Sequence, residues 1–152
     1  MDPNERKERQ QHFDSRLQSQ DETHPGWKDA WLTFCHTLLE HGGAIGVPPP
    51  TPDPLLGMLQ ERGTVHHISR VIHIVGEQSA CHRNVAALWR SGQAISTGTG
   101  YALSEDEIWR EHSWAWDHEG RLIETTEIRC CYFGVRFEGP NCQWFIEWVD
   151  PS

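Results

Sequence analysis

The chain has 152 residues and a formal charge of −9 at neutral pH, because 22 acidic side chains outnumber 13 lysines and arginines. A chain of this length is typical of one domain, and it buries enough surface to fold without a metal or a disulfide. Hydrophobic residues make up 37% of it, which excludes wholesale disorder. An overall negative charge repels phosphate backbones, so nucleic-acid binding is not expected.

The sequence indicates neither membrane insertion nor export. No apolar run approaches the roughly 20 residues of a membrane-spanning helix. The first ten residues, MDPNERKERQ, are charged and lack the apolar segment of a signal peptide. The five cysteines lack CxxC spacing, which favours free thiols in a reducing compartment. We therefore expect a cytoplasmic protein with no membrane contact.

The first half of the chain is expected to contain mainly helices. Residues 1–24 are polar and are predicted to form a flexible arm, and 25–152 to form a single domain. Apolar residues at helical spacing, with Gly42-Gly43 after them, predict a helix over 26–41. The proline-rich segment 47–54 excludes regular structure.

Two further elements are expected before the middle of the chain. Residues 55–63 predict a short helix. Residues 65–75 (VHHISRVIHIV) are β-branched and partly alternating, which predicts one strand with Ile68, Ile72 and Ile74 on the same side.

The second half has β character after one helix. Good helix formers predict a helix over 81–90 that ends at Ser91-Gly92. Five strands are expected after it, two of them joined by the turn DHEG as a hairpin. Helices followed by an antiparallel meander predict an α+β fold. The five expected strands are 94–103, 112–116, 121–126, 130–137 and 142–149.

Cys81 is the first candidate for chemistry, because it begins the helix expected over 81–90. Unpaired N–H groups and the helix dipole at that position stabilise a thiolate, which lowers the thiol pKa. The same N–H groups can stabilise the oxyanion that forms when a thiolate attacks a carbonyl. The position therefore indicates a nucleophile.

A nucleophilic cysteine needs a base and a group that orients it. His112 opens the first strand of the expected hairpin and Glu124 lies on the returning strand, so the two can approach across neighbouring strands. Asp117 is a rival orienting acid, but it lies at the turn. Strand parity favours Glu124 over Asp117.

The segment around these residues resembles the transglutaminase-like enzymes of the papain-like superfamily. CHRNVAALWR is similar to that family's cysteine helix, HSW (112–114) to its His-x-Trp motif, and ETT (124–126) to its acidic residue before threonine. The resemblance covers 78–126, about a third of the chain. Two positions depart from the family pattern, since Glu124 stands where aspartate is usual and Ser79 where a glycine is common.

The resemblance implies a papain-like, transglutaminase-like core and thiol-mediated acyl transfer on an amide or peptide bond. Cys81 would attack, His112 would activate it and protonate the leaving amine, and Glu124 would orient His112. Gln78 is a candidate oxyanion donor. Separately, Trp114 or Trp116 is a candidate wall of the cleft that keeps water from His112. The expected substrate is a peptide or protein amide, with a glutamine side chain among the candidates, and no cofactor is required.

Two other readings of the sequence remain open. A non-catalytic binding protein on the same scaffold would leave Cys81 idle. A zinc-binding domain would use nitrogen and sulfur ligands, but no pair among the candidates has the spacing that preassembles a site, so no metal is expected. The candidate zinc ligands are His66, His67, His73, Cys81 and His82.

Overall fold

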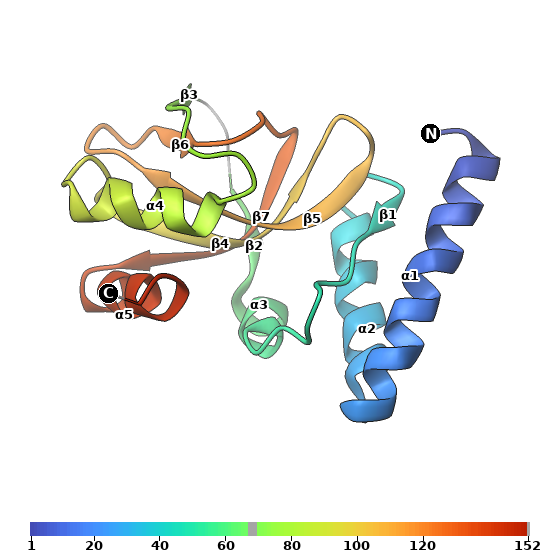
Figure 1. The fold of residues 1–152 in the computed structure, drawn as a ribbon. Coiled ribbons are helices and arrows are strands. Elements are labelled where there is room, and N and C mark those ends of the chain that lie inside the picture. The colour runs from blue at the N-terminus through green and yellow to red at the C-terminus, as the bar shows by residue number, and fades with distance from the viewer. Residues whose placement is uncertain (67–69, 152) are drawn as a thin grey trace.

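The computed structural model describes residues 1–66 and 70–151. They form five helices and a seven-stranded, mostly antiparallel sheet, which confirms the expected α+β class (Figure 1). The helices are α1 (Pro3–Thr23), α2 (Trp27–Leu39), α3 (Leu56–Arg62), α4 (Cys81–Arg90) and α5 (Pro140–Val149). The strands are β1 (Ile45–Gly46), β2 (Thr64–Val65), β3 (Val71–His73), β4 (Ser96–Leu103), β5 (Ile108–Trp116), β6 (Leu122–Glu124) and β7 (Cys131–Glu138).

The strand order differs from the meander that the sequence predicts. The order is β2-β7-β4-β5-β6-β3, with β1 attached in parallel to β5. Strands β4, β5 and β6 do follow one another as antiparallel neighbours. Strand β7, however, returns to pair with β4 over its full length instead of adding beyond β6. The sheet centre therefore consists of β7, β4 and β5.

All five helices contribute to a core on one face of the sheet. Tyr101, Ala115, Phe133 and other alternate strand residues point into this core. The opposite face has a smaller cluster of strand side chains: Ala102, Trp114, Trp116, Leu122 and Tyr132. In Figure 1, α4 and α5 lie over one part of the sheet while α1 and α2 lie far from them, on the right of the view.

Residues Pro3–Thr23 form the regular helix α1, where the sequence predicts a flexible polar arm. Pro3 occupies the first turn of α1, where a missing N–H costs nothing, and the Asp2 side chain accepts from Asn4 N. Leu17 is buried, and Gln20 accepts from Trp27 Nε1 while donating to Pro49 O. A few contacts from an otherwise polar helix thus attach it to α2 and to the proline-rich segment.

The single strand expected over 65–75 is instead two short strands in different parts of the sheet. Strand β2 pairs with β7 at one side, and β3 pairs in parallel with β6 at the other. His67 and Ile68 lie outside the described residues. The β-branched composition correctly indicated strand, but it does not reveal that the segment connects the two sides of the sheet.

The strand expected over 142–149 is wrong, because these residues form α5. Gly139 and Pro140 begin the helix, and the buried residues Cys142, Phe145 and Ile146 follow helical spacing. Trp144 and Trp148 are four residues apart and lie on the exposed side. The high aromatic content of the segment favoured a strand, although its apolar period is that of a helix.

In residues 1–66 and 70–151, no helix combines the length and apolarity required to cross a bilayer. The strands expected over 94–103, 112–116, 121–126 and 130–137 correspond to β4, β5, β6 and β7. The α+β class follows directly from these elements.

Candidate active site

The site lies where one edge of β5 has no neighbouring strand. Strand β4 occupies one edge of β5 from Trp109 to Trp116. On the other edge, β1 pairs only with Ile108 and Trp109, and β6 only with Ala115 and Trp116. Among the described strands, residues 110–114 of β5 are therefore unpaired on this side. His112 is at the middle of this gap.

The structure brings His112 and Glu124 together, as the hairpin register predicts. His112 Nε2 lies 2.9 Å from Glu124 Oε1 and 3.0 Å from Oε2. Both side chains are almost completely buried, and Trp114 and Tyr132 pack beside the imidazole ring. The ring lies on the sheet face away from α4, and its Nδ1 remains available because Nε2 is bound to the carboxylate.

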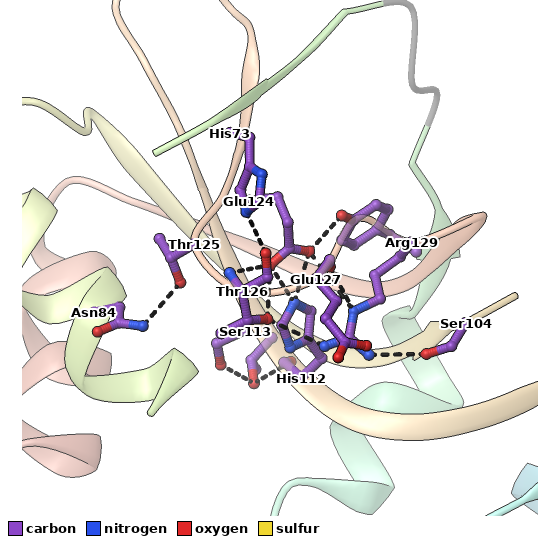
Figure 2. Close-up of polar contacts among 12 residues, drawn as sticks. His73, Asn84, Ser104, His112, Ser113, Glu124, Thr125, Thr126, Glu127 and Arg129 are labelled. Carbon is purple, nitrogen blue, oxygen red and sulfur yellow. Dashed lines mark hydrogen bonds and ion pairs between the residues drawn. The ribbon is translucent and has the colours of Figure 1, made fainter. Parts of the chain in front are cut away.

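Other groups hold the Glu124 carboxylate in place (Figure 2). Tyr132 Oη donates to Oε1 at 2.6 Å, and Thr126 donates to Oε2 from its backbone N at 3.0 Å and from its hydroxyl at 3.1 Å. Arg129 lies 3.9 Å from Oε1 and donates to Ser104 Oγ and Thr126 Oγ1. These contacts fix the orientation of the carboxylate, because both of its oxygens accept hydrogen bonds.

The environment favours a neutral imidazole beside an ionised carboxylate. Burial lowers the pKa of His112, although the adjacent Glu124 partly opposes this effect. Burial alone would raise the pKa of Glu124, but hydrogen bonds from His112, Tyr132 and Thr126 N lower it to about 2. At neutral pH, His112 is therefore able to accept a proton and Glu124 is able to stabilise the resulting imidazolium.

Cys81 is the first residue of α4, as the sequence predicts. Ser79, two residues earlier, has a φ of +59°, in the left-handed region that glycine adopts most easily. The tight backbone before α4 turns the chain so that the helix begins at the cysteine.

Asn84 fixes the loop that precedes Cys81. Its amide accepts from Glu77 N at 3.0 Å and donates to Glu77 O at 2.7 Å and to Thr125 Oγ1 at 3.2 Å. A Cβ atom at Gly76 would lie 2.4 Å from Asn84 Cγ, so a larger residue there would displace the Asn84 amide. Asn84 therefore connects the cysteine loop to the segment that follows Glu124 (Figure 2).

The Cys81 sulfur contacts the backbone of β5 immediately after His112. The backbone N–H groups of Ser113 and His82 hydrogen-bond the sulfur. Burial nevertheless raises the pKa of the Cys81 thiol, and the nearby carboxylates Glu111 and Glu124 add to the increase. This result corrects the expectation of a lowered pKa, because desolvation outweighs the helix-start amides. The resting site contains a neutral thiol.

Cys81 and His112 line the same pocket of about 990 Å³. They reach it from different sides, since Cys81 belongs to the helix-covered face and His112 to the opposite face. Within the described residues, no hydrogen bond joins the thiol to the imidazole. The unpaired edge of β5 lies between them, and hydrogen bonds of this kind are often long in ligand-free enzymes.

A second histidine–glutamate pair flanks Cys81 on the helix-covered face. His82 Nδ1 lies 2.6 Å from Ser113 Oγ, and its Nε2 lies 3.1 Å from Glu111 Oε1. The Ser113 hydroxyl also contacts Thr99 Oγ1 at 3.0 Å. Ser113 is completely buried, so this chain of hydrogen bonds anchors the start of α4 to β5.

The remaining sequence candidates separate into different regions. Gln78 lines the pocket beside Cys81. Trp114 is completely buried and packs against His112 from inside the sheet, so it covers the imidazole but is not one of the described residues that line the pocket. Asp117 instead binds Arg121 and the backbone of the turn, at 2.7 Å from Arg121 Nε.

The zinc candidates do not assemble within the described residues. No group of three or more histidine, cysteine, aspartate or glutamate side chains there is placed to hold a metal ion. His82 is bound to Ser113 and Glu111, whereas His66 lines a pocket on another part of the sheet.

Sequence reasoning missed several residues around the His112–Glu124 pair. Tyr132 lies eight positions after Glu124, and only the pairing of β7 with β4 brings its hydroxyl to the carboxylate. Thr126 was recognisable, because a residue two positions after an acid commonly donates its backbone N–H to it. Arg129 carried no local signal.

Compared with family models, with curated proteins and with solved structures, the chain has no match. The geometry of the site is therefore the only basis for inferring a function.

Proposed function

We propose that the protein is a cysteine-dependent acyl-transfer enzyme that acts on an amide or peptide bond, on a transglutaminase-like core of the papain-like type. Cys81 is the nucleophile, His112 the general base and acid, and Glu124 the residue that orients His112. The substrate class is a peptide or protein amide, including a glutamine side chain.

The observation that carries this proposal is the buried His112–Glu124 pair. Its carboxylate is ionised, its imidazole is neutral, and its pocket also contains Cys81. Structural ion pairs also perturb pKa values, but a histidine whose Nε2 is fixed by a carboxylate and whose other nitrogen is available matches the geometry of a general base.

The reaction begins with proton transfer from the neutral Cys81 thiol to His112 as the sulfur attacks the amide carbonyl carbon. The carbonyl π electrons move to oxygen, and N–H groups at the start of α4, with Gln78 as a side-chain candidate, stabilise that oxyanion. Collapse of the intermediate breaks the C–N bond, and the His112 imidazolium protonates the leaving amine. A thioester on Cys81 remains.

The thioester then passes its acyl group to water or to an amine. His112 accepts a proton from the incoming nucleophile and returns it to the Cys81 sulfur as the C–S bond breaks. Water as acceptor makes the protein a peptidase, amidase or deamidase, and an amine acceptor makes it a transglutaminase-like transferase.

The test is to trap the acyl-enzyme with an activated ester, p-nitrophenyl acetate, and to locate the acetyl group by peptide mass spectrometry. We expect an acetyl thioester on Cys81 that forms faster than acetylation of the exposed thiol of Cys130. Cys81→Ala removes the label and keeps the fold, as circular dichroism should show.

The chain supplies internal controls, because each cysteine is read separately. Cys35 is half-buried and burial raises its pKa, but it is not among the described residues that line the pocket of His112. If Cys81 acetylates no faster than Cys35, or equally fast in folded His112→Ala protein, the enzyme proposal is wrong and a binding protein with an idle cysteine is the better description.

A further inference from the structure

A second pocket, far from Cys81 in the sheet order, differs from the candidate active site in its charge. It has a volume of about 400 Å³ and lies between α3, β2, β7 and the start of α5. Its lining includes Arg62 and Arg136, and the described lining residues include no aspartate or glutamate. By contrast, carboxylates outnumber guanidinium groups in the lining of the active-site pocket, which contains Glu105, Asp106, Glu111 and Glu127 beside Arg110 and Arg129.

This separation of charge is notable in a chain that carries −9 overall. A positive pocket in an acidic protein is costly for a cationic ligand to enter and favourable for an anion. Within the described residues, the Arg62 guanidinium makes no ion pair or hydrogen bond, so its five N–H donors are available. An oxyanion is the ligand that matches such a fork of donors.

Arg136 is held in one position while part of its guanidinium remains unused. Its Nε donates to Ser96 Oγ at 2.8 Å and lies 3.1 Å from Glu138 Oε1, and its Cζ lies 4.4 Å from the centre of the Trp116 ring. All the polar contacts described for Arg136 use Nε. The terminal amino groups are thus oriented in advance, which reduces the entropy lost on binding.

His66 adds an unsatisfied polar atom to the wall of this pocket. Its Nε2 is buried and has no hydrogen-bond partner within the described residues, and the same is true of Trp114 Nε1. The two rings contact each other, with centroids 5.6 Å apart. Burial of a polar atom without a partner costs about 1–3 kcal/mol, so a hydrogen bond from a ligand to His66 Nε2 would be favourable.

The pocket also has an apolar side that limits the kind of anion. Trp144 lines it and is 52% exposed, and its ring lies 6.1 Å from that of Phe137. Asn141, at the start of α5, supplies a further amide to the lining. An oxyanion attached to a flat apolar group would use both sides of the pocket.

We propose that the pocket formed by Arg62, His66, Arg136, Asn141 and Trp144 binds a small ligand that carries a carboxylate or phosphate next to an aromatic or other flat apolar group. The oxyanion contacts the two guanidinium groups, and the apolar part packs on Trp144 and Phe137. The site is separate from Cys81 and does not depend on the proposed catalytic function.

The experiment is a titration of the full chain with benzoate and with phenyl phosphate. Binding is monitored by calorimetry and by the NMR signals of the Trp144 indole and the Asn141 side-chain amide. Both anions should give saturable shifts at these two residues, and the tighter one identifies the preferred oxyanion. Neutral benzamide and cationic benzamidine have the same ring and should produce no saturable shift.

Variants assign the binding to the pocket. Arg62→Gln should weaken anion binding by about ten-fold or more, since a hydrogen bond to a charged group contributes at least that factor. Arg9→Gln makes the same charge change on α1, where Arg9 pairs with Glu5, and should change affinity by less than two-fold. Trp144→Leu should weaken phenyl phosphate but leave inorganic phosphate unchanged.

Arg136→Gln is a second variant, but it also removes the contacts with Ser96 and Trp116 and needs a folding check. Arg62→Gln loses no contact within the described residues, so it decides the question by itself. The proposal is overturned if benzamide binds as tightly as benzoate, or if Arg62→Gln and Arg9→Gln bind the anions equally well.

Discussion

Two histidine–glutamate pairs lie on opposite faces of β5, which contributes the neighbouring residues Glu111 and His112, one to each pair. His112 and Glu124 are 2% and 0% exposed, whereas the side chains of His82 and Glu111 are 34% and 37% exposed. The buried Glu124 receives donors from three residues, and the exposed Glu111 receives one from His82. The two pairs have the same chemistry but different surroundings.

The difference shows how burial changes the electrostatic properties of a common pair of side chains. In the buried pair, water does not compete for the carboxylate, so its orientation holds and its pKa falls to about 2. In the exposed pair, solvent screens the interaction, which is then worth little. We therefore assign proton transfer to His112 and anchoring of α4 to His82.

The largest effect is expected from His112→Ala. Loss of the general base should slow acetylation of Cys81 by about 10²–10⁴-fold, as measured by peptide mass spectrometry. His82→Ala should slow it by much less, because the His82 side chain contacts Ser113 and Glu111. Equal losses in the two variants would show that the pairs are not functionally distinct.

Glu124→Gln should produce the next largest effect. The amide keeps the shape of the side chain but no longer stabilises an imidazolium, so acetylation of Cys81 should fall on the order of 100-fold. The matched change at the turn, Asp117→Asn, lies away from His112 and should leave the rate unchanged. A stronger effect at Asp117 would reverse the assignment of the orienting acid.

Acid should weaken the wild-type fold through the same buried pair. The pKa of Glu124 is about 2 in the fold against 4.5 without its partners, so its stabilisation is present above pH 4.5 and is lost as pH falls toward 2. The lowered pKa of His112 acts in the same direction. Below pH 6.5 the imidazole of His112 binds a proton more readily in the unfolded chain than in the folded protein, so acid favours unfolding.

The Glu124 contribution is on the order of 3 kcal/mol. Urea unfolding at a series of pH values measures it, with Glu124→Gln as the control. In the variant, the free energy of unfolding should depend much less on pH below pH 4.5. If the free energy of unfolding of the variant depends on pH as strongly as that of the wild type, the acid-sensitive group is not Glu124.

The smallest predicted effect is an increase, not a decrease, in the reactivity of Cys81, caused by a substitution at Glu111. Glu111 raises the pKa of the Cys81 thiol, so Glu111→Gln should shift the midpoint of iodoacetamide alkylation at Cys81 to lower pH and increase its rate at neutral pH a few-fold. Replacement of glutamate by glutamine thus slows acetylation of Cys81 when it is made at Glu124, and speeds alkylation of Cys81 when it is made at Glu111. Two changes in the same direction would contradict the comparison.

Local signals in the sequence were sufficient for much of the site. The start of a helix placed Cys81, and the hairpin parity placed Glu124 beside His112 in preference to Asp117. These predictions succeed because they depend on contacts between neighbouring elements. The raised pKa of Cys81 was not predictable, since it depends on burial, which only the packed molecule determines.

The errors in the fold have a similar cause. Trp144 and Trp148 suggested a strand because aromatic residues favour strands, but their four-residue separation equally fits the exposed side of a helix. The split of 65–75 between β2 and β3 depends on which strands pair at the two sides of the sheet. Tyr132 reaches Glu124 for the same long-range reason.

The unpaired stretch of β5 also affects how the protein behaves at high concentration. An open strand edge is a template on which another chain can pair, and proteins commonly protect such edges with charged side chains. Here Arg110 and Glu111 occupy the stretch, and Arg110 is paired with Asp106. Salt weakens that protection, so the edge beside the proposed active site is also where self-association would begin as ionic strength rises.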